Sequence, residues 1–248
     1  MDLILIGTTG VVLGALLLAE RLWPARQFPV IRGWRLTGAL FLALFVPVSG
    51  SVALILPPRW LEAHALLHLE PLPYGLELVC GFLLATFSYY WLHRAQHRFH
   101  WFWRSGHQMH HAIQRVDLGA TAFLHPTDLF LQIAVTLVVC AFVLGLSPEA
   151  TATVSLIAGV AGFFQHVNLS TPTWVALFCQ RPEAHCRHHE IGVHSYNFGD
   201  FPLWDVLFGT FSNPKDWAGE AGFGSAPRIK DLMLMRDVSG PPEVAGAR

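Results

Sequence analysis

Long stretches without a charged residue alternate along the chain with short segments in which the charges are concentrated. A helix rises 1.5 Å per residue, so about 20 mostly apolar residues cross a bilayer. The uncharged stretches are residues 3–19, 36–56, 78–92, 129–148 and 150–180. The pattern predicts an all-α, polytopic membrane bundle of about four to five transmembrane helices, in which the first and third stretches need flanking residues to span.

The composition agrees with a membrane environment. The 248-residue chain is 53% hydrophobic and 13% charged, whereas soluble domains carry about 25% charged residues. The net charge of −1 gives no sign of a nucleic-acid partner, and we expect none.

The arginines predict the orientation of the helices. Arg21, Arg26, Arg32 and Arg35 lie between the first two apolar stretches, whereas the loop at 57–73 has one arginine. The positive-inside rule therefore predicts a cytoplasmic first loop and an N-terminus outside. The first stretch lacks a basic start and a cleavage site, which favours a retained helix over a signal peptide. The last uncharged stretch would return the chain to the cytoplasmic side near His166.

Histidine is concentrated where the third apolar stretch ends, and six of the nineteen residues from 93 to 111 are histidine. Residues spaced by three or four lie on one helix face, and neutral imidazole binds iron, zinc, copper or nickel. Three groups show this spacing: His93 and His97; His107, His110 and His111; His185, His188 and His189. We expect each group to share a face and all three to converge in a helical cap on the cytoplasmic side.

Eight imidazoles exceed the three or four ligands of one zinc ion. The sequence therefore predicts two metals, with His166 as the ninth ligand. His125, His194 and Asn168 are candidates for further ligands or for groups that orient ligands.

Other histidine chemistry fits less well. The sequence HHEIGVH is no zinc-protease motif, because His189 and His194 are five residues apart rather than four. His64 and His68 fit an interfacial role in the outer loop. His100 shares the face of His93, but its aromatic neighbours indicate the membrane interface. The four cysteines form no CxxC pair and are expected to be apolar filler.

The order HxxxH, HxxHH, HxxHH at 93–97, 107–111 and 185–189 resembles the fatty acid hydroxylase/sterol desaturase superfamily of membrane non-haem di-iron enzymes. The surrounding sequences are also similar: YYWLHRAQH, FWRSGHQMHH, FLHPTD, FQHVNL and NFGDFPLWDVLFGT. The resemblance covers about residues 74–212. One departure is Glu190, which replaces the usual serine after the last box.

The resemblance implies two non-haem iron ions, O2 as co-substrate and an external electron donor of the ferredoxin, cytochrome b5 or reductase type. The implied reaction is hydroxylation, or less often desaturation, of an unactivated C–H bond in a membrane lipid. The alternative is a non-catalytic metal-binding or transport protein that reuses the site.

The resemblance also suggests a division of the chain. Residues 1–73 would form N-terminal transmembrane helices and loops, residues 74–212 the catalytic domain, and residues 213–248 a mobile tail with one short helix near 229–236. Two roles stay open for the arginines Arg94, Arg98 and Arg104, which would dock an acidic donor or bind lipid phosphates. Two also stay open for the aromatic residues Tyr89, Tyr90, Trp91, Trp101, Trp103 and Trp204, namely an interfacial belt or a pocket lining.

Overall fold

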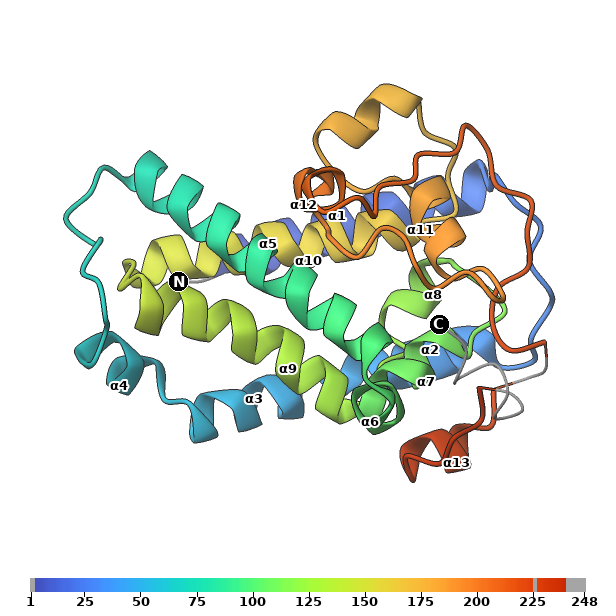
Figure 1. Cartoon of the computed structure of the whole chain (residues 1–248), viewed down its shortest axis with the longest axis horizontal. Helices are drawn as coiled ribbons and strands as arrows, with labels where there is room; N and C mark the ends of the chain where they lie inside the picture. Colours follow the sequence, from blue (N-terminus) through green and yellow to red (C-terminus); the bar gives the residue numbers. More distant parts are fainter. Residues whose placement is uncertain (1–2, 225–226, 240–248) are drawn as a thin grey trace.

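The computed structural model describes residues 3–224 and 227–239, and every statement about structure below refers to these residues. They form helices and loops and contain no β-strand, which confirms the expected all-α class; a single isolated bridge joins Glu190 to Ala221. Figure 1 shows the longer helices lying side by side with their short connections at the two ends.

Three long helical segments make the centre of the molecule. They are α5 (Tyr74–Arg98), α9 (Pro126–Leu137) with a π-helical continuation (Val138–Val143), and α10 (Pro148–His166). Their shared core includes Ala85, Cys140 and Val154. Both α9 and α10 begin with proline, which lacks the N–H that a first turn would leave unpaired. Ser147 caps α10 by accepting a hydrogen bond from the amide of Ala150 (3.2 Å).

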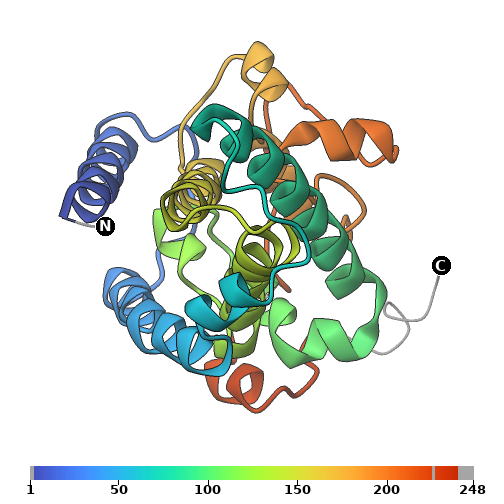
Figure 2. The same ribbon diagram turned by 90° about the vertical axis from the view of Figure 1, so that its left-hand side faces the viewer.

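The N-terminal helices pack around this centre, as the end-on view in Figure 2 shows. They are α1 (Leu3–Leu22), α2 (Trp34–Ala43), α3 (Phe45–Ile55) and α4 (Pro58–Ala63). α1 contacts α10, α2 contacts the short α8 (Leu118–Thr121), and α3 contacts α9. The indole of Trp34 anchors α2 by donating to Asp117 (2.9 Å). The stretch predicted at 36–56 is therefore two helices that meet at Leu44.

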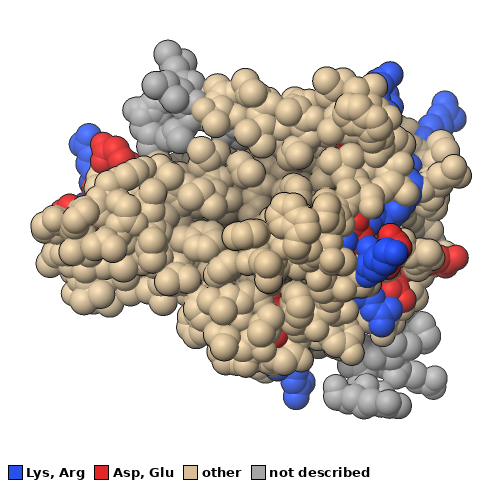
Figure 3. Space-filling view, turned by 90° about the horizontal axis from the view of Figure 1, so that it is seen from above, with Lys and Arg blue, Asp and Glu red and all other residues tan. Residues whose placement is uncertain are grey.

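Within the described part of the chain, three helical segments are long and apolar enough to cross a membrane: Trp34–Ala63, Tyr74–Arg98 and Pro126–Val143. These segments indicate a membrane protein, while a total of four to five spans stays a prediction. In Figure 3 the acidic and basic side chains gather mainly toward one end of the molecule, with a smaller group at the other end. Most of the face seen in this view carries no charge between the two ends, as expected for a belt in lipid.

The two ends of the bundle differ in content. At one end, the loop after α4 pairs with the end of the π-helix, because the amides of Leu66 and Leu67 donate to the carbonyls of Phe142 and Val143. The other end carries short elements: α6 (His100–Phe102), a π-helix (Trp103–His107), α7 (Gln108–His111), a 3-10 helix (Thr173–Leu177), α11 (Pro182–His188) and α12 (Pro202–Leu207). All three histidine groups lie at this second end, away from the loop that holds His64 and His68.

The segment after residue 212 differs from the expected free tail. The short helix α13 (Ile229–Met233) is present, and Leu232 is buried with Met109 and Ile113. Gln108 also donates to the carbonyl of Arg236 (2.7 Å). The described part of this segment is thus packed on α7, whereas residues 225–226 and 240–248 lie outside the described residues. The domain boundaries stay a prediction.

Candidate metal centre

Nine histidines gather in two groups at the end of the bundle. Within each group, one potential ligand atom per residue lies within 4.8 Å of every other. The first group is His93, His97, His107, His111 and His188; the second group is His110, His166, His185 and His189. All nine were expected from the sequence, and the second group draws on α7, α10 and α11.

Each HxxHH box contributes to both groups. In the box on α7, His107 and His111 belong to the first group and His110 to the second. In the box on α11 the assignment is reversed: His185 and His189 belong to the second group and His188 to the first. Our expectation that the three histidines of a box would serve one face is therefore wrong. Adjacent residues of a helix are about 100° apart, so an HH pair directs its two rings to different points.

Backbone carbonyls hold three of the rings in one tautomer. The Nδ1 of His93 donates to the carbonyl of Phe198, that of His166 to the carbonyl of Gly162, and that of His188 to the carbonyl of Tyr196. Each of these distances is 2.7 Å. A ring that donates through Nδ1 has its lone pair on Nε2, the atom that points into the group. The amide of Gln180 lies 3.1 Å from the Nδ1 of His185.

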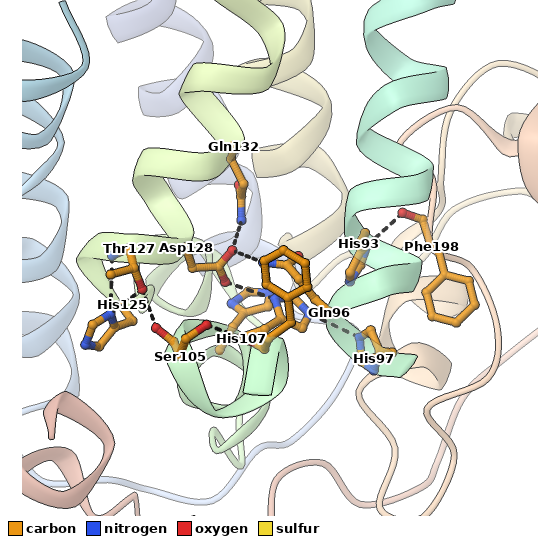
Figure 4. A network of polar contacts seen from close by, with 12 residues as sticks. His93, Gln96, His97, Ser105, His107, His125, Thr127, Asp128, Gln132 and Phe198 are labelled. Atoms are coloured by element: carbon orange, nitrogen blue, oxygen red, sulfur yellow. Dashed lines mark hydrogen bonds and ion pairs between the residues drawn. The ribbon is translucent and has the colours of Figure 1, made fainter. Parts of the chain in front are cut away.

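A buried carboxylate holds a fourth ring (Figure 4). Asp128 of α9 accepts a hydrogen bond from the Nδ1 of His107 (2.9 Å) and others from Gln96 (2.7 Å) and Gln132 (3.2 Å). A carboxylate behind an imidazole fixes its orientation and raises its basicity as a ligand. Our sequence analysis missed Asp128, although it closes the FLHPTD sequence.

The nitrogen positions fit a bound metal. The Nε2 atom of His166 lies 3.1 Å from the Nε2 of His110 and 2.9 Å from the Nε2 of His185. Metal–nitrogen bonds of about 2.0–2.1 Å put two ligands about 2.9 Å apart at a right angle and about 3.3 Å apart in a tetrahedron. In addition, the Nε2 atoms of His93, His111 and His188 are buried without a hydrogen-bond partner, and such atoms require an explanation.

Five histidines of the two groups have a pKa that favours the neutral ring at physiological pH. Burial, reinforced by neighbouring imidazoles, holds the pKa of His110, His111, His185, His188 and His189 well below the usual value. Neutral imidazole is the form that binds metals. The donor set and its ionisation both suit a transition metal of borderline softness.

A cavity of about 210 Å³ opens from the bundle interior onto the histidines. An engineered cavity of about 150 Å³ binds benzene, so this space admits part of a lipid. His110, His166 and His185 of the second group line it, whereas His93 alone lines it from the first group. Its apolar lining includes Phe45, Phe82, Leu124, Leu129, Ile133 and Phe163. Substrate in this cavity would meet the second group first.

The model of the family described as "Fatty acid hydroxylase" matches residues 78–210, which are more than half of the chain and include all nine histidines. The chain belongs to the fatty acid hydroxylase family. Members of this family generally depend on iron, in agreement with the histidine groups.

Two curated relatives are similar to this family member. An ornithine lipid hydroxylase, OlsE, of Rhizobium tropici is 27% identical over 168 residues, which cover 66% of this chain and 50% of the relative. Lathosterol oxidase of Homo sapiens is 28% identical over 181 residues, which cover 69% of this chain and 58% of the relative. The chain thus spans about half the length of the curated relatives it matches. No solved structure matches it significantly.

The sequence NFGDFPLWDVLFGT, which resembles the family, forms a loop and the short helix α12, and together they support the histidines. Asp205 accepts hydrogen bonds from the amides of Phe198 and Gly199, both 2.8 Å, and from Thr210 (2.7 Å). Asn197 adopts a left-handed conformation (φ 57°), to which asparagine is well suited. These contacts place the Phe198 carbonyl against His93. Burial raises the pKa of Asp205 to about 6.

The further candidates of the sequence analysis lie outside both groups. His194 stands beside the first group, with its ring 5.1 Å from that of His111, and burial lowers its pKa to about 4. His125 accepts from the amide of Thr127 at the start of α9. Asn168 contacts the backbone of Arg26 and no histidine of either group.

His100 is half-exposed and pairs with Asp237 (2.7 Å) rather than with metal-binding groups. Glu190, the departure from the family pattern, directs its carboxylate to Arg187 (2.7 Å) and the Trp217 indole (2.9 Å), away from the histidines. The four cysteines are free, in agreement with an apolar role.

The aromatic residues divide between the two expected roles. Trp91 and Trp101 are exposed, as in an interfacial belt, whereas Tyr90 is fully buried and Tyr89 lines the cavity. Of the remaining two, Trp103 lies beside His97, and Trp204 donates to Thr86.

Two of the three arginines considered for docking a partner are already engaged. Arg94 donates to the hydroxyl of Tyr90 (2.8 Å), and Arg104 donates to the carbonyl of Met235 (3.1 Å). These contacts leave less of their hydrogen-bonding capacity for an acidic donor protein or a lipid phosphate.

Proposed function

We propose that the protein is a membrane-bound, O2-dependent oxidoreductase that hydroxylates an unactivated C–H bond of a lipid, such as a sterol or fatty acyl lipid, at two non-haem iron ions. Desaturation of such a bond is the alternative outcome at the same site. The observation that carries the proposal is the cavity that leads from the apolar bundle directly onto a group of buried, neutral imidazoles. Family membership and the two relatives support it.

The nine histidines would hold the two irons, with five ligands in the first group and four in the second. Bound iron would supply the reduction of O2 and the oxidation of the C–H bond; hydroxylation consumes two electrons and two protons per O2 and yields the alcohol and water. An external donor of the ferredoxin, cytochrome b5 or reductase type would deliver the electrons.

The side chains of this protein have three tasks in that reaction. The carbonyls of Phe198, Gly162 and Tyr196 and the carboxylate of Asp128 orient the rings, so that little reorganisation is required when metal binds. The apolar cavity wall positions the lipid and excludes water from the site. We further propose that the site faces the cytoplasm and that the N-terminus is outside, since the arginines of the first loop favour this orientation.

The test is oxygen incorporation. Full-length protein in vesicles that contain candidate sterols and fatty acyl lipids is loaded with ferrous iron, supplied with a reductant and donor, and exposed to 18O2. Mass spectrometry should detect one 18O atom in a lipid product, with none for His185→Ala. Iron binding without O2 consumption or lipid oxidation, under every donor tried, would instead favour the non-catalytic metal-binding protein.

A further inference from the structure

Among the described residues that line the cavity, Asp200 is the one with a carboxylate. It lines the cavity together with His166 and His185. Two contacts fix the loop that carries it. The backbone amide of Gln180 donates to the backbone carbonyl of Asp200 (3.0 Å). The ring of Phe201 packs on that of Phe82, with 5.1 Å between the ring centroids. The carboxylate is therefore held in place beside the second histidine group.

The carboxylate of Asp200 has acceptor positions that no described residue fills. A carboxylate has about four acceptor positions, yet among the described residues it receives one hydrogen bond, from the Nε2 of Gln165 (2.9 Å). Asp200 is half-buried, and a carboxylate that is partly removed from water favours a hydrogen-bond donor in the adjoining space. In agreement with this, burial raises the pKa of Asp200 to about 7.

Two other carboxylates at this end of the bundle each accept three hydrogen bonds. Asp128 receives hydrogen bonds from three side chains, and Asp205 receives them from two backbone amides and one hydroxyl. Both serve the support of histidines. Asp200 supports no histidine by a hydrogen bond among the described residues. Its unfilled acceptor positions adjoin the space that a substrate would fill.

We propose that Asp200, positioned by Gln165, is the specificity-determining residue of the cavity and accepts a hydrogen bond from a hydroxyl or ammonium group that the lipid carries near its reacting carbon. The inference rests on the proposed function, because it takes the cavity as the substrate site. It narrows the substrate class to lipids with a donor group close to the oxidised position, with their apolar remainder along α5, α9 and α10.

Three matched probes test this without turnover: 1-dodecanol, dodecylammonium and dodecyl methyl ether, which has no donor. Their dissociation constants for full-length, metal-loaded protein in a neutral detergent are measured by calorimetry. Wild type should bind the alcohol and the ammonium about tenfold or more tightly than the ether, as expected for hydrogen bonds to a charged group. Asp200→Leu should reduce both preferences to within about twofold.

Asp200→Asn separates the two donors, because it keeps an acceptor oxygen and removes the charge. It should retain part of the preference for the alcohol and lose most of that for the ammonium; it also serves if the leucine variant does not fold. Asp231→Asn is the matched control, since Asp231 lies on α13 and pairs with Arg228 and Arg236 outside the cavity. It should bind all probes as wild type does.

Equal binding of alcohol and ether by wild type would overturn the inference, as would an unchanged preference in Asp200→Leu or an unchanged ammonium preference in Asp200→Asn. The proposed function fails separately. Loss of the oxidation of every lipid, with the probe preferences intact, would leave Asp200 as a recognition group in a protein that is not an oxygenase.

Discussion

At the scale of single residues, the histidines differ most in what supports the nitrogen that faces away from the metal. Three Nδ1 atoms donate to carbonyls, whereas that of His107 donates to the carboxylate of Asp128. A negative charge behind one ligand of the first group makes that ligand a stronger base. The two groups are therefore unequal both in ligand number and in electronic support.

Replacing Asp128 by Asn tests this support. The amide keeps the shape but loses the charge, so the first group should bind metal about 10–100-fold more weakly while the second group is unaffected. Competition with a chelator should then resolve one weak and one unchanged equivalent. The control is Asp237→Asn, which removes the carboxylate from the exposed His100 pair and should change neither. Wild-type affinity at both sites in Asp128→Asn would refute the assigned role.

The acidity of the histidines predicts how the metal-free protein responds to pH. The pKa of His194 is lowered to about 4, and those of His110, His111, His185, His188 and His189 lie well below 6.5. In the unfolded chain the histidines have ordinary pKa values near 6.5. Below that pH the unfolded chain therefore binds more protons than the folded chain. Stability should therefore be full above pH 6.5 and fall as the pH drops toward 4.

Thermal unfolding in the presence of a chelator at pH 7.5 and 5.5 measures this, with a lower Tm expected at pH 5.5. Asp200 acts in the opposite sense, because its pKa is raised to about 7 and its contribution is lost as the pH rises through that value. Asp205, with its pKa raised to about 6, acts in the same sense as Asp200, so two carboxyl groups oppose six histidines. A higher Tm at pH 5.5 would contradict the assigned neutral histidines.

The sequence was sufficient to identify the nine histidines but not their partners. Histidine spacing is visible in the letters, whereas the carbonyls of Phe198, Gly162 and Tyr196 belong to the backbone and carry no residue signature. Asp128 lies 21 residues from His107, directly before the stretch at 129–148 that we interpreted as a membrane span. Its role depends on tertiary contact.

At the scale of elements, short helices determine which group each histidine joins. The second box begins at His107, the last residue of a π-helix, and continues in α7, which has only four residues; α11 ends at His188. Our assignment of one face per box assumed a continuous helix whose residues serve a single site. It failed because the two groups lie on either side of each box, a relation that spacing within one box does not reveal.

The close contact between the π-helix and α9 gives an element-scale prediction. A Cβ at Gly106 would lie 3.0 Å from the Cβ and 3.1 Å from the backbone nitrogen of Asp128. Gly106→Ala should therefore push the start of α9 away from His107, lower the free energy of unfolding by about 1–3 kcal/mol and weaken metal binding at the first group.

Gly50→Ala is the matched control, because a Cβ at this α3 position meets no atom within 4 Å. Alanine is the better helix former there, so stability should be unchanged or rise by up to about 1 kcal/mol. Chemical unfolding and chelator competition on both variants provide the measurements. Equal behaviour of the two variants would show that the helix contact does not control the site.

At the scale of the whole molecule, the bundle separates a histidine end from a loop end. The apolar segments between them were readable from the sequence, because lipid requires long uncharged stretches. The packing of α13 on α7 was not, since nothing in the letters distinguishes its anchor, Leu232, from the other apolar residues of IKDLMLM at 229–235. Contacts of that kind depend on the assembled surface of the bundle.

Orientation in the membrane is a prediction of the arginine distribution. Reporter fusions at the two termini of the chain should place the N-terminus outside and the C-terminus in the cytoplasm. A glycosylatable or cysteine tag in the loop at 57–73 should report the outside as well. Both termini on one side would mean an even number of crossings and would contradict this topology.

The most direct test of the account is the metal content of the active protein. Full-length protein loaded anaerobically with ferrous iron and freed of loose metal should contain about two irons per chain, because the nine imidazoles form two groups. Mössbauer spectra should show two environments, and His110→Ala should deplete one of them. One iron per chain in fully active protein, or two irons retained unchanged in His110→Ala, would contradict it.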